Sequence, residues 1–540
     1  MFKAKNNSLL GETETKSIDA WPKRIIFTPR DLQNSLRLKK AGSWGHAQAV
    51  LQTLDRLNIA SLLDPQPSGT RSWFLGLILA RVLRQAGPRV SKSLRATIAR
   101  KLKIPQSEAF PEEKAWAWLK LRLLALEKSL VDRHARANEP VFIRLRAQRG
   151  QVGSGQDDLA ASPIYVATLV DRLDRPLGGR IFALSASRLW PKLEDWLSSL
   201  GLTRAIVVGQ WRARDFLSLR ERSHFDWLTL WPSQALLKLA QEFLDPKAFF
   251  NQEILAFQDP KGHPNERLIA SQNLWLKARR SEIRRARLAE ALVDLDKAQT
   301  ERKRLKERAD FVPELAEPNF KALALEDLTL DPEYILLKYF SKKYIDINYI
   351  DDGFEYKLNN ENIANDEILD GLKVYRTSVP ELVLSNEECI SQFKKYNEES
   401  NILIASYLDG PSQAKKIDES LNASFMVTIL ARYVKWHMEE AWRAIIWRNP
   451  GLARPAWEPQ AGLDQSPLEL NAATGWPPKS PPVETLSGGF EGLMRYLAKA
   501  RALSFSARTA WGRKVNFNRL ALDPFQEKAL KELEKIPRWL

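Results

Sequence analysis

Between residues 141 and 230, five short apolar and β-branched runs alternate with helical segments, and this order constrains the fold most. The runs are Val141–Leu145, Ile164–Val170, Gly179–Leu184, Ala205–Val208 and Trp227–Leu230. Runs of this length and composition predict strands. The polar segment Asp171–Pro176 predicts a turn that joins the second and third strands as a hairpin. Helices fit Trp190–Leu200 and Ala213–Arg222. The order predicts an α/β fold with three antiparallel strands, then helix, strand, helix and strand.

The region before these strands, residues 42–137, is predicted to be helical. Apolar residues repeat at three- and four-residue spacing in Ala47–Leu57, Arg71–Ala86, Ser91–Leu102 and Glu112–Leu130. Its basic side chains fit either a DNA-facing helical domain or a solvated helix face. The candidates for DNA contact are Arg81, Arg84 and Arg95. Residues 1–41 are expected to be a weakly ordered leader.

The charge of the chain favours a polyanionic partner. The formal net charge is +16 and the sequence pI is about 9.6. Nucleic acid is the first candidate for such a partner and an anionic membrane surface the second. The 18 tryptophans could supply stacking surfaces. A basic protein that binds neither partner is the alternative.

The cysteine count and the lack of long apolar segments exclude several classes of protein. The single cysteine, Cys389, excludes intramolecular disulfides and a cysteine-based zinc finger. No window holds the ~20 apolar residues of a membrane span, and the first residues do not resemble a signal peptide. We therefore expect a cytoplasmic protein with no membrane partner.

A long helix rich in arginine and lysine is predicted from Leu274 to Arg308. Glutamates and aspartates interleave with its basic residues at helical spacing, which is typical of a solvent-exposed helix laced with ion pairs. A helix that contacts phosphates is the functional alternative. The candidate DNA-binding residues on it are Arg279, Arg280, Arg284 and Arg285.

The composition changes between residues 331 and 424. This segment has no tryptophan, one arginine (Arg376), and 18 acidic against 10 basic residues. Such a contiguous island suggests a chimeric origin. Within it, Tyr344–Tyr349 and Gly353–Leu358 predict a hairpin, and Leu372–Thr377 predicts a strand.

Helices are predicted again at Asn386–Ser406 and Ala414–Ile446, and two short ones at Leu486–Leu503 and Pro524–Leu540. The domain organisation that follows is a leader (1–41), a helical DNA-binding domain (42–137), the first part of a core (138–240), an insertion with the basic helix (241–380), late helices that complete the core (381–448), a proline-rich linker (449–484) and C-terminal helices (485–540).

In the order and spacing of several segments, the chain resembles the DDE transposases of insertion sequences, in the group whose ribonuclease-H-like core carries a β-rich insertion. The segments that carry this likeness are Gly45–Ile59, Leu63–Leu83, Leu169–Leu177, Gly201–Gly209, Asp370–Ser378 and Arg432–Ala441. The likeness runs from about residue 42 to residue 505. It implies a ribonuclease-H-like mixed sheet with flanking helices, a β-rich and helical insertion, and an N-terminal all-α domain.

The resemblance also implies metal-dependent cut-and-paste transposition, in which three carboxylates hold two Mg²⁺ ions. The matching positions in this chain are Arg144, Gln210 and Ser400. Two unit cations about 4 Å apart repel by about 4 kcal/mol at an effective dielectric of 20, so Arg144 would expel a metal. No metal or other cofactor is therefore expected, although the family uses Mg²⁺.

Nearby acids could restore the catalytic site in one alternative. Asp215 follows Gln210, and Glu399 precedes Ser400. The favoured hypothesis is a transposase-like protein that binds double-stranded DNA, with transposon ends among the candidate targets, and does not cleave it. We expect a homodimer on DNA, associated with a bacterial nucleoid. The alternatives are an active transposase with relocated carboxylates, a decayed or artificial copy without function, and an interaction protein with no nucleic-acid role.

Overall fold

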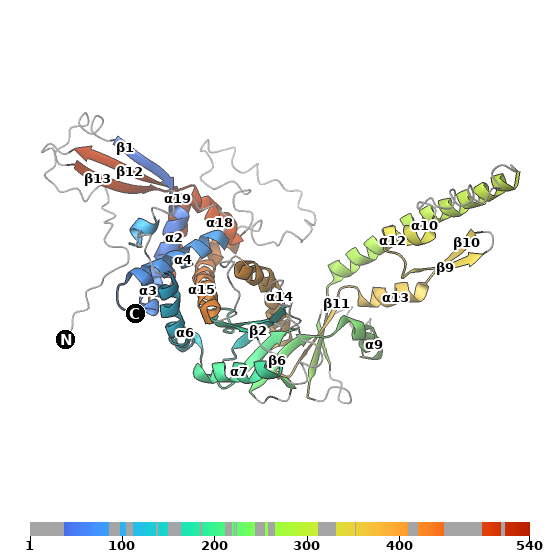
Figure 1. Ribbon diagram of the computed structural model, residues 1–540, viewed down its shortest axis with the longest axis horizontal. Helices are drawn as coiled ribbons and strands as arrows, with labels where there is room; N and C mark the ends of the chain where they lie inside the picture. The colour runs from blue at the N-terminus through green and yellow to red at the C-terminus, as the bar shows by residue number, and fades with distance from the viewer. Residues whose placement is uncertain are drawn as a thin grey trace, which may run out of the picture. The chain divides into compact units, whose positions relative to one another are not determined.

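The computed structural model divides the chain into two compact units, residues 1–205 with 401–540 and residues 206–400. Helices and sheets occur in both units, so the chain is of the predicted mixed α/β class (Figure 1). The structure describes residues 37–85, 98–103, 112–136, 139–148, 164–183, 186–210, 219–220, 222, 224–243, 254–257, 265–311, 331–350, 353–408, 419–447, 489–508 and 514–539.

In the first unit, three antiparallel strands lie in the order β4-β3-β2. Their bounds are Phe142–Gln148 (β2), Ile164–Val170 (β3) and Pro176–Ala183 (β4). These strands confirm the first three sequence predictions. The β3–β4 turn contains Asp174 at φ 73°, and the strand register shifts beside it, between Leu169 and Val170. A left-handed residue at a hairpin bulge is a common way to close such a turn, and aspartate tolerates that conformation.

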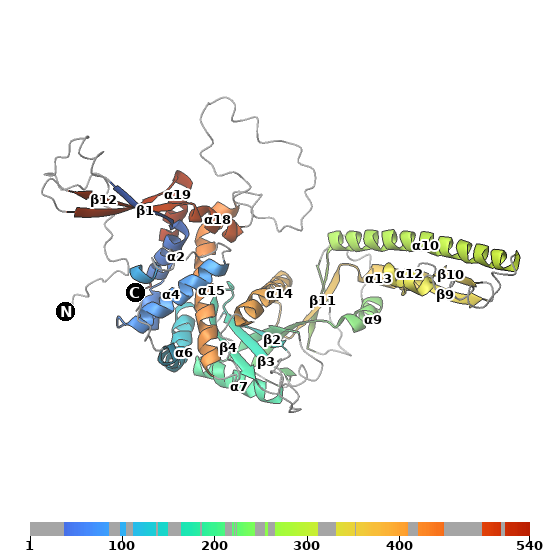
Figure 2. The same ribbon diagram turned by 45° about the horizontal axis from the view of Figure 1, so that its top comes forward.

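Helix α15 is the centre of the helical part of this unit (Figure 2). It contacts β4, α2, α4 and α6, and much of it is buried, including Tyr433 and Trp442. A Cβ at Gly179 of β4 would lie 2.5 Å from the ring of Phe425, so glycine there allows the close approach of helix and strand. The bounds are Gly45–Arg56 (α2), Ile59–Leu63 (α3), Gly69–Gln85 (α4), Glu112–His134 (α6), Ala186–Ser199 (α7) and Glu419–Trp447 (α15).

The C-terminal part of the first unit differs from the prediction. The helix expected over 486–503 ends at Ala498, and the chain then enters an antiparallel sheet in the order β1-β12-β13. The last helix ends at Glu532 and continues only as a 3-10 turn, Leu533–Lys535. The bounds are Arg37–Ser43 (β1), Gly489–Ala498 (α18), Arg501–Arg508 (β12), Lys514–Ala521 (β13) and Pro524–Glu532 (α19). Strand β12 pairs with β1, more than 450 residues away in the sequence, and local periodicity carries no information on such a partner.

In the second unit, five strands lie in the order β5-β6-β11-β8-β7. Alternate residues of β11 face opposite sides of the sheet. Leu372 and Val374 pack with α9 residues such as Leu239, whereas the ring of Tyr375 lies 5.4 Å from that of Phe393 in α14. The bounds are Ala205–Gly209 (β5), Phe225–Leu230 (β6), Ser233–Phe243 (α9), Ile254–Phe257 (β7), Arg267–Gln272 (β8), Leu372–Thr377 (β11) and Asn386–Leu408 (α14). The predicted strand in β11 is confirmed at both ends; β7, β8 and α9 were not predicted.

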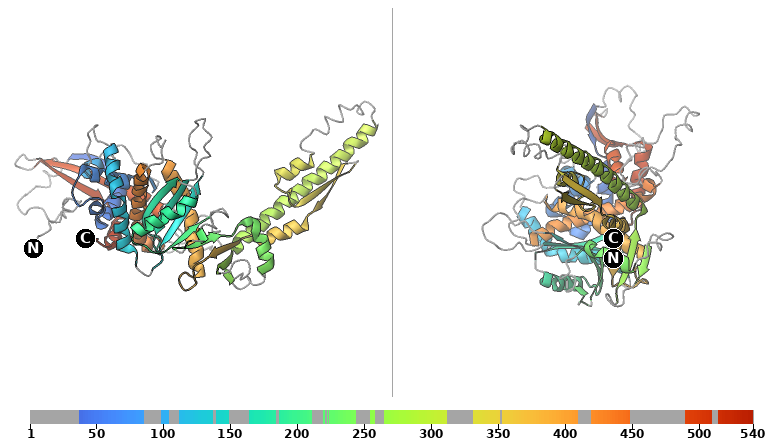
Figure 3. Two further views of the ribbon diagram at one scale, coloured as in Figure 1. Left: turned by 60° about the horizontal axis from the view of Figure 1, so that its bottom comes forward. Right: turned by 90° about the vertical axis from the view of Figure 1, so that its right-hand side faces the viewer.

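The rest of the second unit is built on the predicted basic helix, α10. One face of α10 buries Leu288, Ala291, Leu295 and Ala298 at three- and four-residue spacing. The β9–β10 hairpin and α12 pack on this face, and α13 follows the hairpin (Figure 3). The bounds are Leu274–Phe311 (α10), Pro332–Lys338 (α12), Ile345–Ile350 (β9), Gly353–Leu358 (β10) and Asn360–Leu369 (α13). The predicted helix and hairpin are therefore confirmed.

Some predictions lie wholly or mostly outside the described residues. These are residues 1–36 of the leader, most of the helix Ala213–Arg222, the first part of Ser91–Leu102, and the linker Asn449–Glu484. The leader predicted over residues 1–41 is wrong at its end, because residues 37–41 belong to strand β1, which pairs with β12. Within the described part of the chain, no helix combines the length and the apolar character that crossing a membrane requires.

Candidate nucleic-acid interface

Arg144 lies in the middle of β2 and is buried, with a relative exposure of 1%. Its neighbour across the sheet is Thr168 of β3. The guanidinium donates a hydrogen bond from Nη2 to Oδ1 of Asp174, in the β3–β4 turn, and so forms an ion pair with it. Burying a guanidinium is costly unless an anion and hydrogen bonds compensate it. The position that the resemblance matches to the first aspartate of the transposases therefore holds a cation paired with its own anion.

The same turn joins a second buried cluster in the first unit. The Asp171 carboxylate accepts a hydrogen bond from the backbone N–H of Arg175 at 2.7 Å. The Arg175 guanidinium contacts Nδ1 of His134 and lies over the Trp436 ring at 4.5 Å. Since Nδ1 accepts from a cation that cannot lose its proton, Nε2 of His134 carries the ring proton and donates it to the Tyr433 hydroxyl at 2.7 Å.

Burial and nearby cations keep the two histidines of this cluster neutral. Burial, Arg175 and His437 lower the pKa of His134 to about 3. Burial and Arg175 lower the pKa of His437 to about 3. The cluster thus links α6, the β3–β4 turn and α15 as a set of hydrogen-bonded structural groups.

Glu127 of α6 is a second buried acid in this unit, with a relative exposure of 0%. Its carboxylate accepts from Arg180 at 2.6 Å, from the Trp196 indole at 3.1 Å and from the Gly179 N–H at 3.2 Å. Burial raises its pKa to about 7, although Arg180 and these donors act in the opposite direction. Its oxygens already accept hydrogen bonds from β4 and α7, so Glu127 has a structural role and joins α6 to these two elements.

The other two positions that the resemblance matches to the triad, Gln210 and Ser400, belong to the second unit. Gln210 directly follows β5 and is exposed. Ser400 and the candidate rescue acid Glu399 lie on α14, but their side chains are outside the described residues, as is all of Asp215. Convergence of Arg144, Gln210 and Ser400 on one site stays a prediction.

The residues present at Arg144 do not fit a divalent metal. Mg²⁺ requires oxygen ligands with free lone pairs, whereas Asp174, the acid bonded to Arg144, is engaged by that guanidinium. Among the described residues, no three histidine, cysteine, aspartate or glutamate side chains form a group that could hold a metal ion.

The three arginines predicted to contact DNA from the N-terminal helices have different surroundings. Arg81 of α4 donates to the Ser424 carbonyl at 2.5 Å and to the Thr428 hydroxyl at 2.8 Å. Burial and the charge of Arg84 lower the pKa of Arg81 to about 10. Arg81 therefore ties α4 to α15, while Arg84 is exposed and Arg95 lies outside the described residues.

The four arginines predicted on α10 also divide into two groups. Arg279 and Arg285 are exposed; they pair with Glu282 at 2.9 Å and Glu367 at 3.9 Å. Exposed pairs of this kind contribute little to stability, so both arginines can exchange their partner for a phosphate. Arg280 and Arg284 instead line a pocket on one side of α10.

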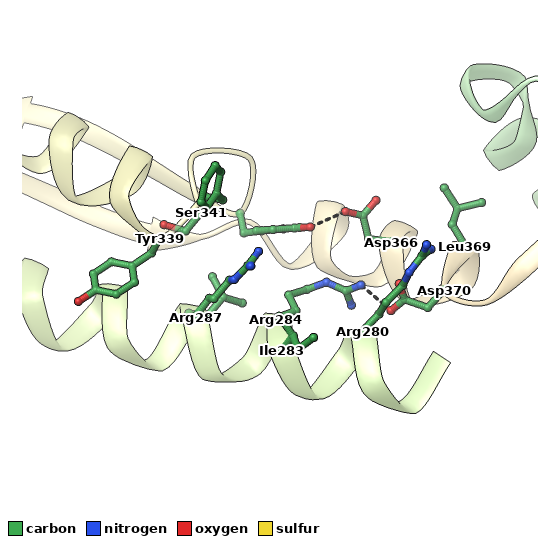
Figure 4. Close-up of a pocket in the computed structure, with 12 residues that line it drawn as sticks. Arg280, Ile283, Arg284, Arg287, Tyr339, Ser341, Asp366, Leu369 and Asp370 are labelled. Carbon is green, nitrogen blue, oxygen red and sulfur yellow. Dashed lines mark hydrogen bonds and ion pairs between the residues drawn. The ribbon is translucent and has the colours of Figure 1, made fainter. Parts of the chain in front are cut away.

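This pocket has a volume of about 470 Å³ and lies between α10, the segment that joins α12 to β9, and the end of α13. Arg280, Arg284 and Arg287 project into it from successive turns of α10 (Figure 4). Facing them are Asp366 and Asp370 from the end of α13, and Phe340 after α12. The sequence indicated the arginines but not the pocket, because its opposite wall comes from residues 339–370. We name it the α10 pocket.

A scan against protein-family models finds no match, and no curated protein matches the chain.

Proposed function

We propose that the chain is a DNA-binding protein of the insertion-sequence transposase type, with the ribonuclease-H-like core which that type implies, and that it does not cleave DNA. Three antiparallel strands followed by α7 and β5 agree with the expected order of elements. The net charge of +16 suits a phosphate backbone. The resemblance in sequence remains the only link to this family.

The observation that carries the loss of cleavage is the buried pair of Arg144 and Asp174. A family aspartate at this position would be a free metal ligand, whereas Arg144 brings a positive charge that its own anion neutralises. The protein would therefore keep the surfaces that hold DNA and lose the group that positions the first metal.

The favoured DNA-contacting residues are exposed cations: Arg84 on α4, and Arg279 and Arg285 on α10. Arg81 and Arg284 are engaged inside their own units, so we assign them no contact with duplex DNA. Double-stranded DNA is the proposed partner, with a homodimer as the binding form and transposon ends as candidate targets.

Two assays on the purified full chain test the two halves of this proposal. The first measures binding of a labelled duplex over a range of salt concentrations. We expect log K to fall linearly with log salt, because each phosphate contact releases counterions. Affinity that does not change with salt would contradict DNA binding through these cations.

The second assay follows nicking of supercoiled plasmid with Mg²⁺ or Mn²⁺, and the expected result is no cleavage. Nicking by the wild-type chain that disappears in Asp215→Ala or Glu399→Ala would instead support the active alternative with relocated carboxylates. Asp195→Ala, which removes an exposed acid of α7, is the matched control.

A further inference from the structure

The α10 pocket concentrates positive charge that its own acids do not neutralise. Its arginines, Arg280, Arg284 and Arg287, are spaced by four and three residues, which places them on one face of the helix. Figure 4 shows these three side chains rising side by side from α10 towards the opposite wall. Such a row of guanidiniums is a favourable arrangement for an oxyanion.

The two carboxylates that line the pocket already have partners. Asp366 accepts from Lys343 and from the Tyr344 hydroxyl, each at 2.6 Å. Burial raises its pKa, but these donors outweigh burial and lower the pKa below the ordinary value. Asp370 is bound by Nη2 of Arg284. Asp366 is thus engaged by groups other than the three arginines, whereas Asp370 neutralises Arg284, so the remaining positive charge belongs to Arg280 and Arg287.

Arg280 and Arg287 have no bonded carboxylate among the described residues. The positive charge of Arg280 also acts on Lys373 in the neighbouring sheet. Burial, followed by the charges of Lys394 and Arg280, lowers the pKa of Lys373 in β11. The pocket is therefore electropositive even though acids contribute to its lining.

Arg284 provides an independent sign of a ligand. Its relative exposure is 9%, and its Nη1 is buried and makes no hydrogen bond of ordinary geometry among the described residues, although the nearby Tyr344 hydroxyl acts to raise the pKa of Arg284. Leaving a buried donor of a charged group unsatisfied costs about 1–3 kcal/mol or more. An anionic oxygen in the pocket would satisfy this donor, and Arg280 and Arg287 would flank it.

Phe340 adds an aromatic surface to the same pocket. It has φ 53° and a relative exposure of 75%. It follows the C-cap of α12 in a Schellman motif, in which the Ser341 N–H donates to the Leu336 carbonyl and the Phe340 N–H donates to the Leu337 carbonyl. Glycine is preferred at this position, and a bulky residue there is strained. The Arg287 guanidinium lies 5.4 Å from the Phe340 ring.

We propose that the α10 pocket binds a nucleoside 5′-monophosphate group. The phosphate is held by Nη1 of Arg284 and by the side chains of Arg280 and Arg287. The base stacks on Phe340, as bases stack on exposed aromatic rings elsewhere. A volume of about 470 Å³ lies within the ordinary range for small-ligand pockets. The group comes from a free mononucleotide or from the 5′ end of a DNA strand, and the pocket does not require the chain to bind duplex DNA.

Calorimetric titration of the full chain tests the proposal with AMP, adenosine, inorganic phosphate, and one single-stranded oligonucleotide with a 5′-phosphate or a 5′-hydroxyl. We expect AMP to bind with one site per chain and at least about tenfold more tightly than adenosine, a difference of about 1.4 kcal/mol. If the 5′-phosphorylated strand binds more tightly than both its 5′-hydroxyl form and AMP, the 5′ end of a strand is the source of the phosphate. If AMP binds more tightly than the 5′-phosphorylated strand, the free nucleotide is the source.

Variants separate the two parts of the site. Arg280→Gln and Arg287→Gln should each weaken AMP at least about tenfold. Phe340→Gly should weaken AMP and leave inorganic phosphate unchanged. Arg304→Gln, on the same helix but outside the pocket and exposed, is the matched control and should change neither. The melting temperature of each variant shows that it remains folded.

Three results would overturn the proposal. One is the absence of heat with both AMP and the phosphorylated strand. Another is binding that Arg280→Gln and Arg287→Gln leave unchanged in folded protein. The third is equal affinity for inorganic phosphate and AMP together with no effect of Phe340→Gly, since the nucleoside would then contribute nothing. Failure of the duplex-binding assay above would not affect these outcomes.

Discussion

The ion pair between Arg144 and Asp174 joins the middle of a buried strand to a turn residue 30 positions later in the chain. Arg144 has a relative side-chain exposure of 1% and Asp174 of 24%. Aspartate is suited to this turn because it tolerates the left-handed backbone at φ 73°. One residue therefore closes the hairpin and also neutralises a buried cation.

Arg144→Met should lower the free energy of unfolding by about 3 kcal/mol, the lower end of the cost of breaking a buried pair, because Asp174 is partly solvated. Denaturant unfolding followed by circular dichroism measures this change. The matched control is Arg136→Met, which removes an exposed pair with Glu139 and should change stability by less than about 0.5 kcal/mol. Equal effects of the two substitutions would show that the Arg144 pair makes no special contribution.

Glu127 should make the folded state less stable as the pH rises, because its pKa is higher in the folded state than its ordinary value. Its folded-state pKa of about 7 lies above the ordinary value of 4.5. The folded state therefore holds the proton more tightly, and this contribution is present below pH 4.5 and is lost as the pH rises to 7. The stability of the wild type relative to Glu127→Gln should fall by on the order of 3 kcal/mol over this range.

Thermal unfolding of wild type and Glu127→Gln across pH 4.5–7 measures this difference. Glu113→Gln, which removes an exposed acid of the same helix, is the matched control for the loss of one carboxylate from α6. If the stability of the wild type relative to Glu127→Gln instead increased as the pH rose, the ion pair with Arg180 would have a larger effect on the pKa of Glu127 than burial has.

His134 and His437 should destabilise the folded state in acid. The pKa of each is lowered from 6.5 to about 3. Their contribution is therefore full above pH 6.5 and is lost as the pH falls towards 3. The stability of the wild type relative to His437→Gln should decline from pH 6.5 to pH 4. Replacement of the exposed His224 by glutamine serves as the control, and a parallel decline there would argue against a role for burial.

The salt dependence of duplex binding should separate surface arginines from structural ones. Arg279→Ala and Arg285→Ala should each reduce the slope of log K against log salt by about 1 if the residue contacts a phosphate. Arg81→Ala should leave this slope unchanged and lower the free energy of unfolding by about 1–3 kcal/mol, because it breaks the bonds to α15. A lower slope for Arg81→Ala without loss of stability would contradict this division.

Phe340→Gly should stabilise the second unit by up to about 1 kcal/mol, since it removes the cost of a bulky residue in the left-handed region. Denaturant unfolding measures the change. Tyr339→Gly, at the neighbouring C-cap with φ −97°, should instead destabilise. If Phe340→Gly were destabilising, the exposed ring would contribute more packing than its 75% exposure suggests.

Local sequence patterns predicted many of the elements because their causes lie within a few residues. The β-branched run of β3 and the alternating run of β11 give strands with the predicted bounds. The spacing of Leu288, Ala291, Leu295 and Ala298 accounts for the buried face of α10. The first residues of β12, 501–503, were predicted as the end of a helix, since the strands that β12 pairs with, β1 and β13, come from other parts of the chain.

The candidate site was predictable only as a list of unusual residues. The resemblance in sequence predicted that Arg144 and Gln210 stand where the family has carboxylates, and the sequence showed that arginines crowd α10. It did not indicate which arginines are free to bind a ligand, because burial and partners arise from distant segments. Arg81 is held by α15 across 343 residues, whereas Asp370, 86 residues away, engages only Nη2 of Arg284.

The sequence by itself determined the α/β class, the net charge and the absence of an acid from the strand Phe142–Gln148, since these depend on composition and local order. The tertiary structure decided which charged side chains pair with other groups of the protein. It placed Asp174 against Arg144 and left Nη1 of Arg284 without an acceptor among the described residues. The physical reason is that the energy of a buried charge depends on the groups that fold around it, and the chain assembles those groups from far apart.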